Sequence, residues 1–84
     1  MSWFVYFLRN KQKDWYYIGS TNDIERRFQE HEKGKVFSSK IHRPLELVFK
    51  KEFSNEKEAR AYERKVKDKR IEKERIIRQI ESRD

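Results

Sequence analysis

The sequence contains no cysteine, and it has no apolar run approaching the roughly 20 residues that a membrane-spanning helix needs. Without cysteine the chain has neither a disulfide framework nor a thiolate metal site, which suits a reducing compartment. No basic region precedes the apolar residues near the N-terminus, which argues against a secretory signal peptide. We therefore expect a cytoplasmic protein without membrane association.

The length and composition leave little room for a large core. The 84 residues correspond to one domain, and a chain of this size buries only about 60% of its unfolded surface. Hydrophobic residues make up 35% and charged residues 44%, a balance that disordered chains also show. The apolar residues are large and clustered, however, so we expect a single folded domain over residues 1–84.

Acidic residues are in the minority. The 22 Lys and Arg residues exceed the 15 Asp and Glu residues, for a net charge of +7. On a small surface this excess favours a polyanionic partner such as nucleic acid. Solubility alone is the alternative explanation, because net charge says nothing about fold.

Two short apolar runs predict a β-hairpin at the N-terminus. Residues 4–8 form the first run, and residues 15–18, closed by Gly19, form the second, with polar residues 9–14 between them. Both runs are rich in strand-forming residues. Neither alternates cleanly between apolar and polar residues, which suggests that helices cover both faces of the sheet.

Two of the three tyrosines of the hairpin, Tyr6 and Tyr17, face each other only in one strand register. If Leu8 pairs with Trp15, then Tyr6 stands opposite Tyr17 on one face, whereas a shift by one residue would separate them. Most strand aromatics belong to a core. A tyrosine hydroxyl needs a polar partner, so two facing tyrosines are also compatible with a polar site.

A helix, a basic loop and a third strand follow. Capping side chains at residues 20–23 precede a helix predicted from Ile24 to about Lys33, which Gly34 ends. Residues 35–44 are predicted to form a loop. A strand is expected at residues 45–53, because Leu45, Leu47 and Phe49 alternate with other residues.

Two helices complete the chain. Ser54 is the expected N-cap of a helix over residues 55–69, and a last helix contains Ile71, Ile76, Ile77 and Ile80. No Gly or Pro separates the two, so they can also form one continuous helix. The predicted fold class is α+β, a small three-stranded, mainly antiparallel sheet flanked by helices in the order β-β-α-β-α-α.

Polar side chains lie on the apolar faces of two predicted helices. At 100° per residue, Arg27 and His31 share the inward face with Ile24 and Phe28. A guanidinium there must pair with an anion or point into a groove. In the later helix, Glu63 falls among the apolar residues Ala59, Tyr62 and Val66. A buried carboxylate must be paired, hydrogen-bonded or bound to a metal, and a structural Arg27–Glu63 ion pair is one alternative.

Together these groups suit the cleavage of a phosphodiester. A carboxylate can hold a divalent metal that polarises a phosphate oxygen, and an arginine can stabilise the charge that develops on the phosphate. A phenol or an imidazole can move a proton to or from water.

The same residues carry a family resemblance. Val5–Tyr6, then Tyr17–Ile18–Gly19, Arg27 and His31 resemble the GIY-YIG nuclease superfamily. The chain looks most like the small stand-alone members related to the N-terminal domain of the bacterial excision-repair nuclease. The likeness extends through the later strand at residues 44–48 and the helix at residues 58–67, so it covers nearly the whole chain.

The resemblance implies a role for each residue. Tyr6, Tyr17, Arg27, His31 and Glu63 would be catalytic, with Tyr17 as the commonly proposed general base. Glu63 would bind a single divalent cation, Mg²⁺ or Mn²⁺. The chain departs from the family pattern in three ways: its first triplet reads Phe4–Val5–Tyr6 without glycine, Ser20 stands where repair-type members carry lysine, and no asparagine follows Asn55.

Two basic segments accompany this set. Phosphate contacts are expected from the first, which comprises Lys33, Lys35, Lys40, His42 and Arg43. The second segment, at residues 64–70, fits either a phosphate-binding surface or a solvated helix face.

Three functions remain open from the sequence. The leading hypothesis is a metal-dependent endonuclease, with DNA favoured as substrate and DNA repair as one possible role. The second is a nucleic-acid-binding module without cleavage, and the third is a small basic protein-interaction domain. One site cuts one strand, so a double-strand break would require a dimer or a protein partner.

Overall fold

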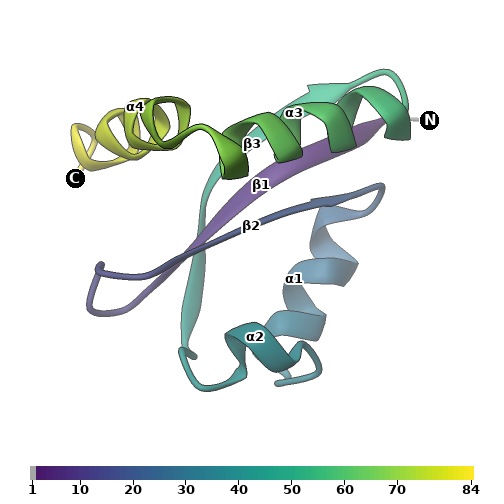
Figure 1. The fold of residues 1–84 in the computed structure, drawn as a ribbon. Coiled ribbons are helices and arrows are strands. Elements are labelled where there is room, and N and C mark those ends of the chain that lie inside the picture. The colour runs from purple at the N-terminus through teal and green to yellow at the C-terminus, as the bar shows by residue number, and fades with distance from the viewer. Residues whose placement is uncertain (1) are drawn as a thin grey trace.

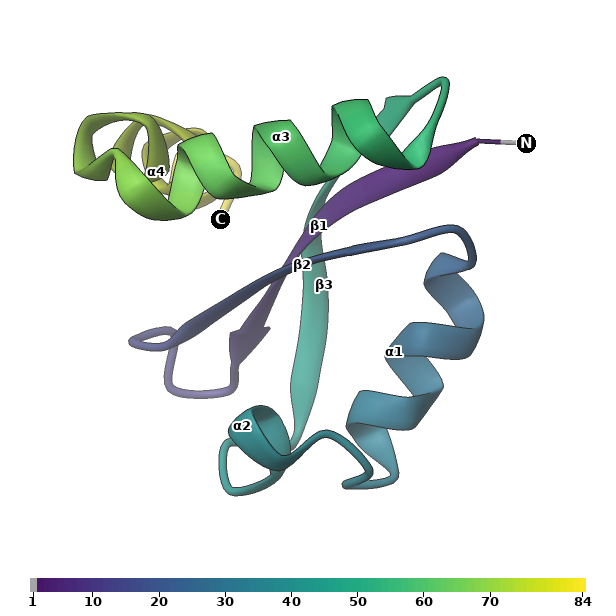
Figure 2. The same ribbon diagram turned by 45° about the vertical axis from the view of Figure 1, so that its right-hand side comes forward.

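The computed structural model describes residues 2–84 and shows a three-stranded sheet between two pairs of helices (Figures 1 and 2). The strands are antiparallel in the order β2-β1-β3, so β2 is an edge strand. Helices α3 and α4 lie on one side of the sheet, and α1 and α2 lie on the other. This architecture confirms the predicted α+β fold class. The elements are β1 (Trp3–Asn10), β2 (Tyr16–Thr21), α1 (Ile24–Glu32), α2 (Phe37–Lys40), β3 (Leu45–Phe53), α3 (Glu56–Asp68) and α4 (Arg70–Glu81).

The hairpin register differs from the predicted one by two residues. Leu8 pairs with Tyr17, and Tyr6 pairs with Gly19, so the predicted Leu8–Trp15 pairing was wrong. The turn sets this register, because the Asn10 side-chain oxygen accepts hydrogen bonds from two backbone N–H groups of the loop at 3.0 and 3.1 Å. A two-residue shift keeps each side chain on its face, so the two tyrosines still share one side of the sheet.

The apolar residues form separate cores on the two faces. The larger core lies beneath α3 and α4, and its buried members are Val5, Phe7, Ile18, Ala59, Val66, Ile76 and Ile80. The smaller core faces α1 and is built around Tyr6, Leu8 and Leu45, with Ile24 and Phe28 packed against it. Because both faces are covered, the strands lack the clean alternation of a half-exposed sheet.

A β-bulge divides β3 between the two cores. Phe7 pairs with Phe49, whereas the next residue, Leu8, pairs with Leu47, which leaves Val48 as the extra residue. Leu45 therefore joins the smaller core while Phe49 packs against the larger one. The bounds of this strand were predicted correctly, but its simple alternation was not.

The helix boundaries depend on specific caps. Asp23 caps α1 by accepting a hydrogen bond from the Arg26 N–H, as expected from the capping cluster. The cap of α3 is Asn55 instead of the predicted Ser54. Lys69 is extended, with φ −108° and ψ 102°, and it separates α3 from α4.

Helix α2 lies within the segment predicted to be a loop. It is a single turn of four residues, too short to produce a periodic pattern in the sequence. None of the helices within residues 2–84 is both long and apolar enough to cross a membrane.

Candidate active site

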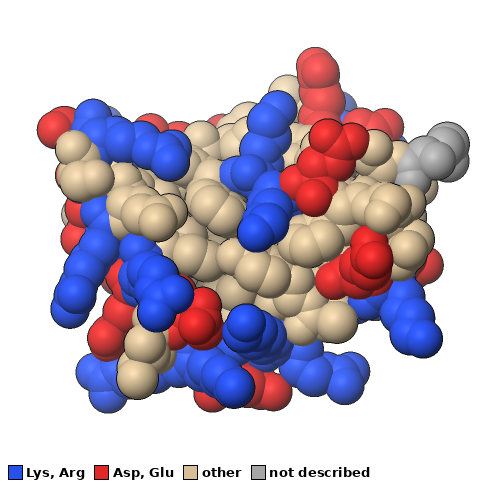
Figure 3. All heavy atoms as spheres, turned by 90° about the horizontal axis from the view of Figure 1, so that it is seen from above, with Lys and Arg blue, Asp and Glu red and all other residues tan. Residues whose placement is uncertain are grey.

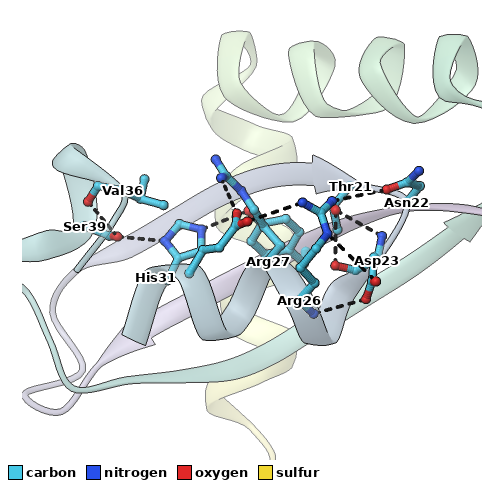
Figure 4. Close-up of polar contacts among 10 residues, drawn as sticks. Thr21, Asn22, Asp23, Arg26, Arg27, His31, Val36 and Ser39 are labelled. Carbon is cyan, nitrogen blue, oxygen red and sulfur yellow. Dashed lines mark hydrogen bonds and ion pairs between the residues drawn. The ribbon is translucent and has the colours of Figure 1, made fainter. Parts of the chain in front are cut away.

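A string of hydrogen bonds connects β1, α1 and α2 at the centre of the site (Figure 4). The Tyr6 hydroxyl lies 3.0 Å from Nε2 of His31, and Nδ1 of His31 lies 2.7 Å from the Ser39 hydroxyl. Ser39 in turn donates to the Val36 carbonyl at 3.4 Å. If the Ser39 hydroxyl hydrogen points to that carbonyl, Nδ1 of His31 donates to Ser39 and Nε2 accepts from Tyr6, and this is the tautomer that we assign.

Burial controls the protonation of both members of the Tyr6–His31 pair. His31 is fully buried, and burial, assisted by the positive charge of Arg27, lowers its pKa to about 4. Burial also raises the pKa of Tyr6 to about 12, with the nearby Tyr17 acting in the same direction and Arg27 acting against it. At neutral pH the imidazole is therefore uncharged and the Tyr6 phenol keeps its proton.

Tyr17 completes an aromatic cluster around the histidine. Its ring lies edge-on to His31 with centroids 4.6 Å apart, and the Tyr6 and Tyr17 centroids are separated by 6.2 Å. Gly19 permits this packing, because a Cβ there would lie 2.7 Å from the Tyr6 hydroxyl and 2.9 Å from a Tyr17 ring carbon. Tyr17 is only half-buried, so it is the phenol of the pair that solvent can reach.

Arg27 extends from α1 beside this cluster. Its guanidinium donates a hydrogen bond to the Glu30 carboxylate at 2.9 Å. This carboxylate is the main reason that the pKa of Arg27 is raised; burial acts in the opposite direction, and the Tyr6 hydroxyl adds to the increase. About one third of its side chain remains exposed. The partner of Arg27 is thus Glu30 and not Glu63, which corrects the alternative of a structural Arg27–Glu63 ion pair.

Glu63 approaches from α3, on the other side of the sheet. Its carboxylate accepts a hydrogen bond from Ser20 of the edge strand at 2.5 Å and pairs with Lys67 at 2.6 Å. Only 16% of its side chain is exposed. The carboxylate borders a surface hollow of about 220 Å³, which Arg60, Arg64, Lys67 and Asp68 also line.

The five predicted residues therefore come from both faces of the sheet. Tyr6, Tyr17, Arg27 and His31 gather on the α1 side, and Glu63 reaches the edge strand from the α3 side. Ser20 and Val5 are register partners, and Val5 belongs to the core beneath α3, so Ser20 presents its hydroxyl to that side.

The sequence matches a known family of proteins. The family model described as GIY-YIG catalytic domain matches residues 2–75. The chain belongs to the GIY-YIG family. The match confirms the resemblance seen in the sequence and assigns the chain to a nuclease-type family, whose nucleases generally use a divalent metal.

Small stand-alone proteins of the GIY-YIG family resemble this chain over most of their length. The UPF0213 protein YazA of Bacillus subtilis (strain 168) is 38% identical over 80 residues, which cover 86% of this chain and 80% of YazA. The UPF0213 protein OB0043 of Oceanobacillus iheyensis is 38% identical over 76 residues, covering 88% and 87%. The solution NMR structure of the UPF0213 protein BH0048 from Bacillus halodurans matches with a TM-score of 0.57 and 32% identity, over 94% of this chain and 85% of that one.

The first basic segment of this GIY-YIG domain contains two kinds of residue. The lysines Lys33, Lys35 and Lys40 are exposed. His42 instead stacks on Trp15, with ring centroids 3.8 Å apart, and is only half exposed. The Arg43 guanidinium donates to the backbone carbonyls of residues 40 and 32. His42 and Arg43 therefore organise the segment, and the lysines are its freely available cations.

The second basic segment is more mixed. Seen from the side of α3 and α4, lysine and arginine side chains are interleaved with acidic ones (Figure 3). Lys67 and Arg70 are each paired with a glutamate on their own helix. Arg64 lines the hollow beside Glu63 and has no carboxylate partner within residues 2–84. Of the segment, the residues nearest the site are thus Arg64 and Lys67.

Two polar contacts of the site were not predicted from the sequence. Ser39 fixes the orientation of His31, but the segment around it gives no local signal of burial. Lys67 engages Glu63 one helical turn away, and this i, i+4 spacing could have indicated the pair.

Proposed function

We propose that this GIY-YIG domain is an endonuclease that hydrolyses phosphodiesters of nucleic acid, with DNA as the favoured substrate and one divalent cation as cofactor. The observation that carries the proposal is the convergence of Tyr6, Tyr17, Arg27 and His31 on one side of the edge strand, with Glu63 reaching that strand from the other. A cytoplasmic location belongs to the same proposal, because a nucleic-acid substrate is available there.

The protonation states support distinct roles for the four groups on the α1 side. Arg27 retains its charge and is partly exposed, so it can donate hydrogen bonds to a phosphate and stabilise the charge that develops there. Tyr6 has a raised pKa and is a poor base, so its hydroxyl positions neighbouring groups. Tyr17 is accessible to solvent and is our candidate for accepting a proton from water, with the neutral His31 imidazole orienting its ring.

Glu63 is the residue that would hold the cation. Within residues 2–84 no three His, Asp or Glu side chains gather in a way that would form an all-protein cage. Mg²⁺ typically keeps several waters and binds through one or two carboxylates plus phosphate oxygens. Glu63, beside a hollow that Asp68 and three basic side chains also line, therefore fits Mg²⁺ or Mn²⁺. When bound, such an ion supplies polarisation of a phosphate oxygen and of a water molecule.

A plasmid-nicking assay tests the proposal. Wild-type protein with Mg²⁺ or Mn²⁺ is expected to nick supercoiled DNA, and a chelator is expected to abolish nicking. Arg27→Ala and Glu63→Gln should each lower the rate by about 100-fold or more, because each removes a charged group acting on the phosphate. Arg75→Ala and Glu74→Gln on α4 are matched controls and should retain activity. Equal rates for the site variants and their controls would refute the assignment.

A non-catalytic nucleic-acid-binding module is the second candidate. The observation that favours it is that the Glu63 carboxylate is already bonded to Ser20 and Lys67. A cation must therefore displace the Lys67 ammonium. This candidate predicts binding that falls steeply with salt and survives Glu63→Gln, with no nicking under any metal. If double-strand breaks are observed, a dimer or a partner protein must supply the second cut.

A further inference from the structure

The α1–α2 side of the molecule presents two large apolar side chains to solvent. Phe37 is 92% exposed and Ile41 is 84% exposed. They are four residues apart at the two ends of α2, a spacing that places side chains on the same side of a helical turn. Contiguous exposed apolar surface can mark a contact site, whereas a single exposed apolar side chain is ordinary, so the charges around this pair decide what it could bind.

The charges around this pair identify the partner. No acidic residue occurs from Lys33 to Pro44. Lys33, Lys35 and Lys40 form no ion pair within residues 2–84. A hollow of about 660 Å³ adjoins Ile41 and is lined by Lys40, Arg43 and Pro44 together with Glu32, whose carboxylate accepts a hydrogen bond from the Leu45 N–H. An aromatic ring among unpaired cations is complementary to a strand of nucleic acid, which offers both phosphates and base faces.

The segment is also fixed in place relative to the site. Ser39, which is fully buried and two residues from Phe37, hydrogen-bonds to His31. His42 stacks on Trp15 at the opposite end of α2. Phe37 is therefore presented from a turn that is attached to the histidine of the candidate active site.

We propose that Phe37 stacks on an unpaired base of the nucleic acid while Lys33, Lys35 and Lys40 contact its phosphates, so that the domain prefers single-stranded or unstacked segments to intact duplex. This inference rests on the proposed function and names its substrate class. Paired bases in a duplex stack on one another, and inserting a side chain between them carries an unstacking cost. An unpaired base carries no such cost, and its face is available to the ring.

Binding is measured by fluorescence anisotropy with chelator present, so that cleavage plays no part. Labelled single-stranded DNA and the matching duplex serve as probes. Phe37→Ala should weaken single-strand binding by about 5- to 100-fold, the range typical for loss of one base–aromatic stack, and should change duplex binding little. Ile71→Ala on α4 removes another exposed apolar side chain, 73% exposed, and should change neither. Lys35→Ala should weaken both probes alike.

A second measurement separates stacking from general apolar contact. A single strand carrying 2-aminopurine should lose fluorescence on binding wild type, because stacking quenches this base, and Phe37→Leu should abolish the quenching. The inference is overturned if Phe37→Ala binds the single strand as tightly as wild type, or if light scattering shows that Phe37 instead holds two copies of the chain together. If the inference about Phe37 fails in either way but nicking still depends on Arg27, the proposed nuclease function stands. A wild type that binds neither probe and nicks nothing would refute the proposed function itself.

Discussion

Protonation of His31 should destabilise the folded protein at mildly acidic pH. The imidazole is fully buried, and its pKa is lowered from 6.5 to about 4 on folding. Between these two pH values the unfolded chain therefore binds a proton on His31 and the folded chain does not. Stability that His31 permits above pH 6.5 is therefore lost as the pH falls toward 4. From these two values, moving from about pH 7.5 to about pH 5 should lower the free energy of unfolding by about 2 kcal/mol.

Urea unfolding followed by circular dichroism measures this effect. His31→Gln retains hydrogen-bonding groups for Tyr6 and Ser39 but has nothing to titrate, so its loss of stability over the same pH range should be smaller than that of wild type by about 2 kcal/mol. Comparing the two proteins cancels the contributions of the carboxylates. His42→Gln is the matched control and should behave as wild type does. If His31→Gln loses as much stability as wild type, the assignment of a buried neutral imidazole is wrong.

Three further substitutions test other parts of the structure. Gly19→Ala would place a methyl group 2.7 Å from the Tyr6 hydroxyl, and the displaced ring should reduce nicking by roughly 100-fold; an unchanged rate would contradict the packing. Lys67→Met removes the ammonium beside Glu63 and should raise Mn²⁺ affinity in calorimetry about two- to fivefold, whereas a weaker affinity would show that Lys67 assists the ion. Asn10→Ala removes the acceptor for two backbone N–H groups and should lower the free energy of unfolding by about 2 kcal/mol in urea titrations; no change would show that the turn does not depend on it.

Local geometry was predictable from the sequence. Helical periodicity placed His31 and Arg27 on the inner face of α1, and it placed Glu63 among the apolar residues of α3. Both placements follow from the 100° turn per residue, which is independent of the rest of the fold. The shared face of Tyr6 and Tyr17 was predicted only on the condition of a particular pairing, and it survived because the actual register differs from that pairing by two residues, an even number.

Features that depend on distant contacts were not predictable. The register followed from the Asn10 turn, whose side-chain hydrogen bonds leave no periodic signal. The β-bulge at Val48 directs Phe49 to the larger core, and neither residue type indicates a bulge in the sequence. Ser39 is buried against His31, which is distant in the sequence. The polar, basic composition of the segment around Ser39 therefore did not indicate that it forms a helical turn. Catalytic roles depend on such distant contacts more than the fold does, so they were less predictable from the sequence.

The separation of the apolar residues into two cores implies that the two helical layers can detach independently. The layer of α3 and α4 rests on aliphatic and aromatic side chains together with the Ser20–Glu63 hydrogen bond, whereas the layer of α1 and α2 is attached through Tyr6, His31 and Ser39. Acid that protonates His31 weakens the second attachment, whereas α3 and α4 contain no histidine. Amide protons of α1 should therefore exchange with solvent sooner than those of α3 as the pH falls, and the layer of α1 and α2 would open while the remainder stays folded.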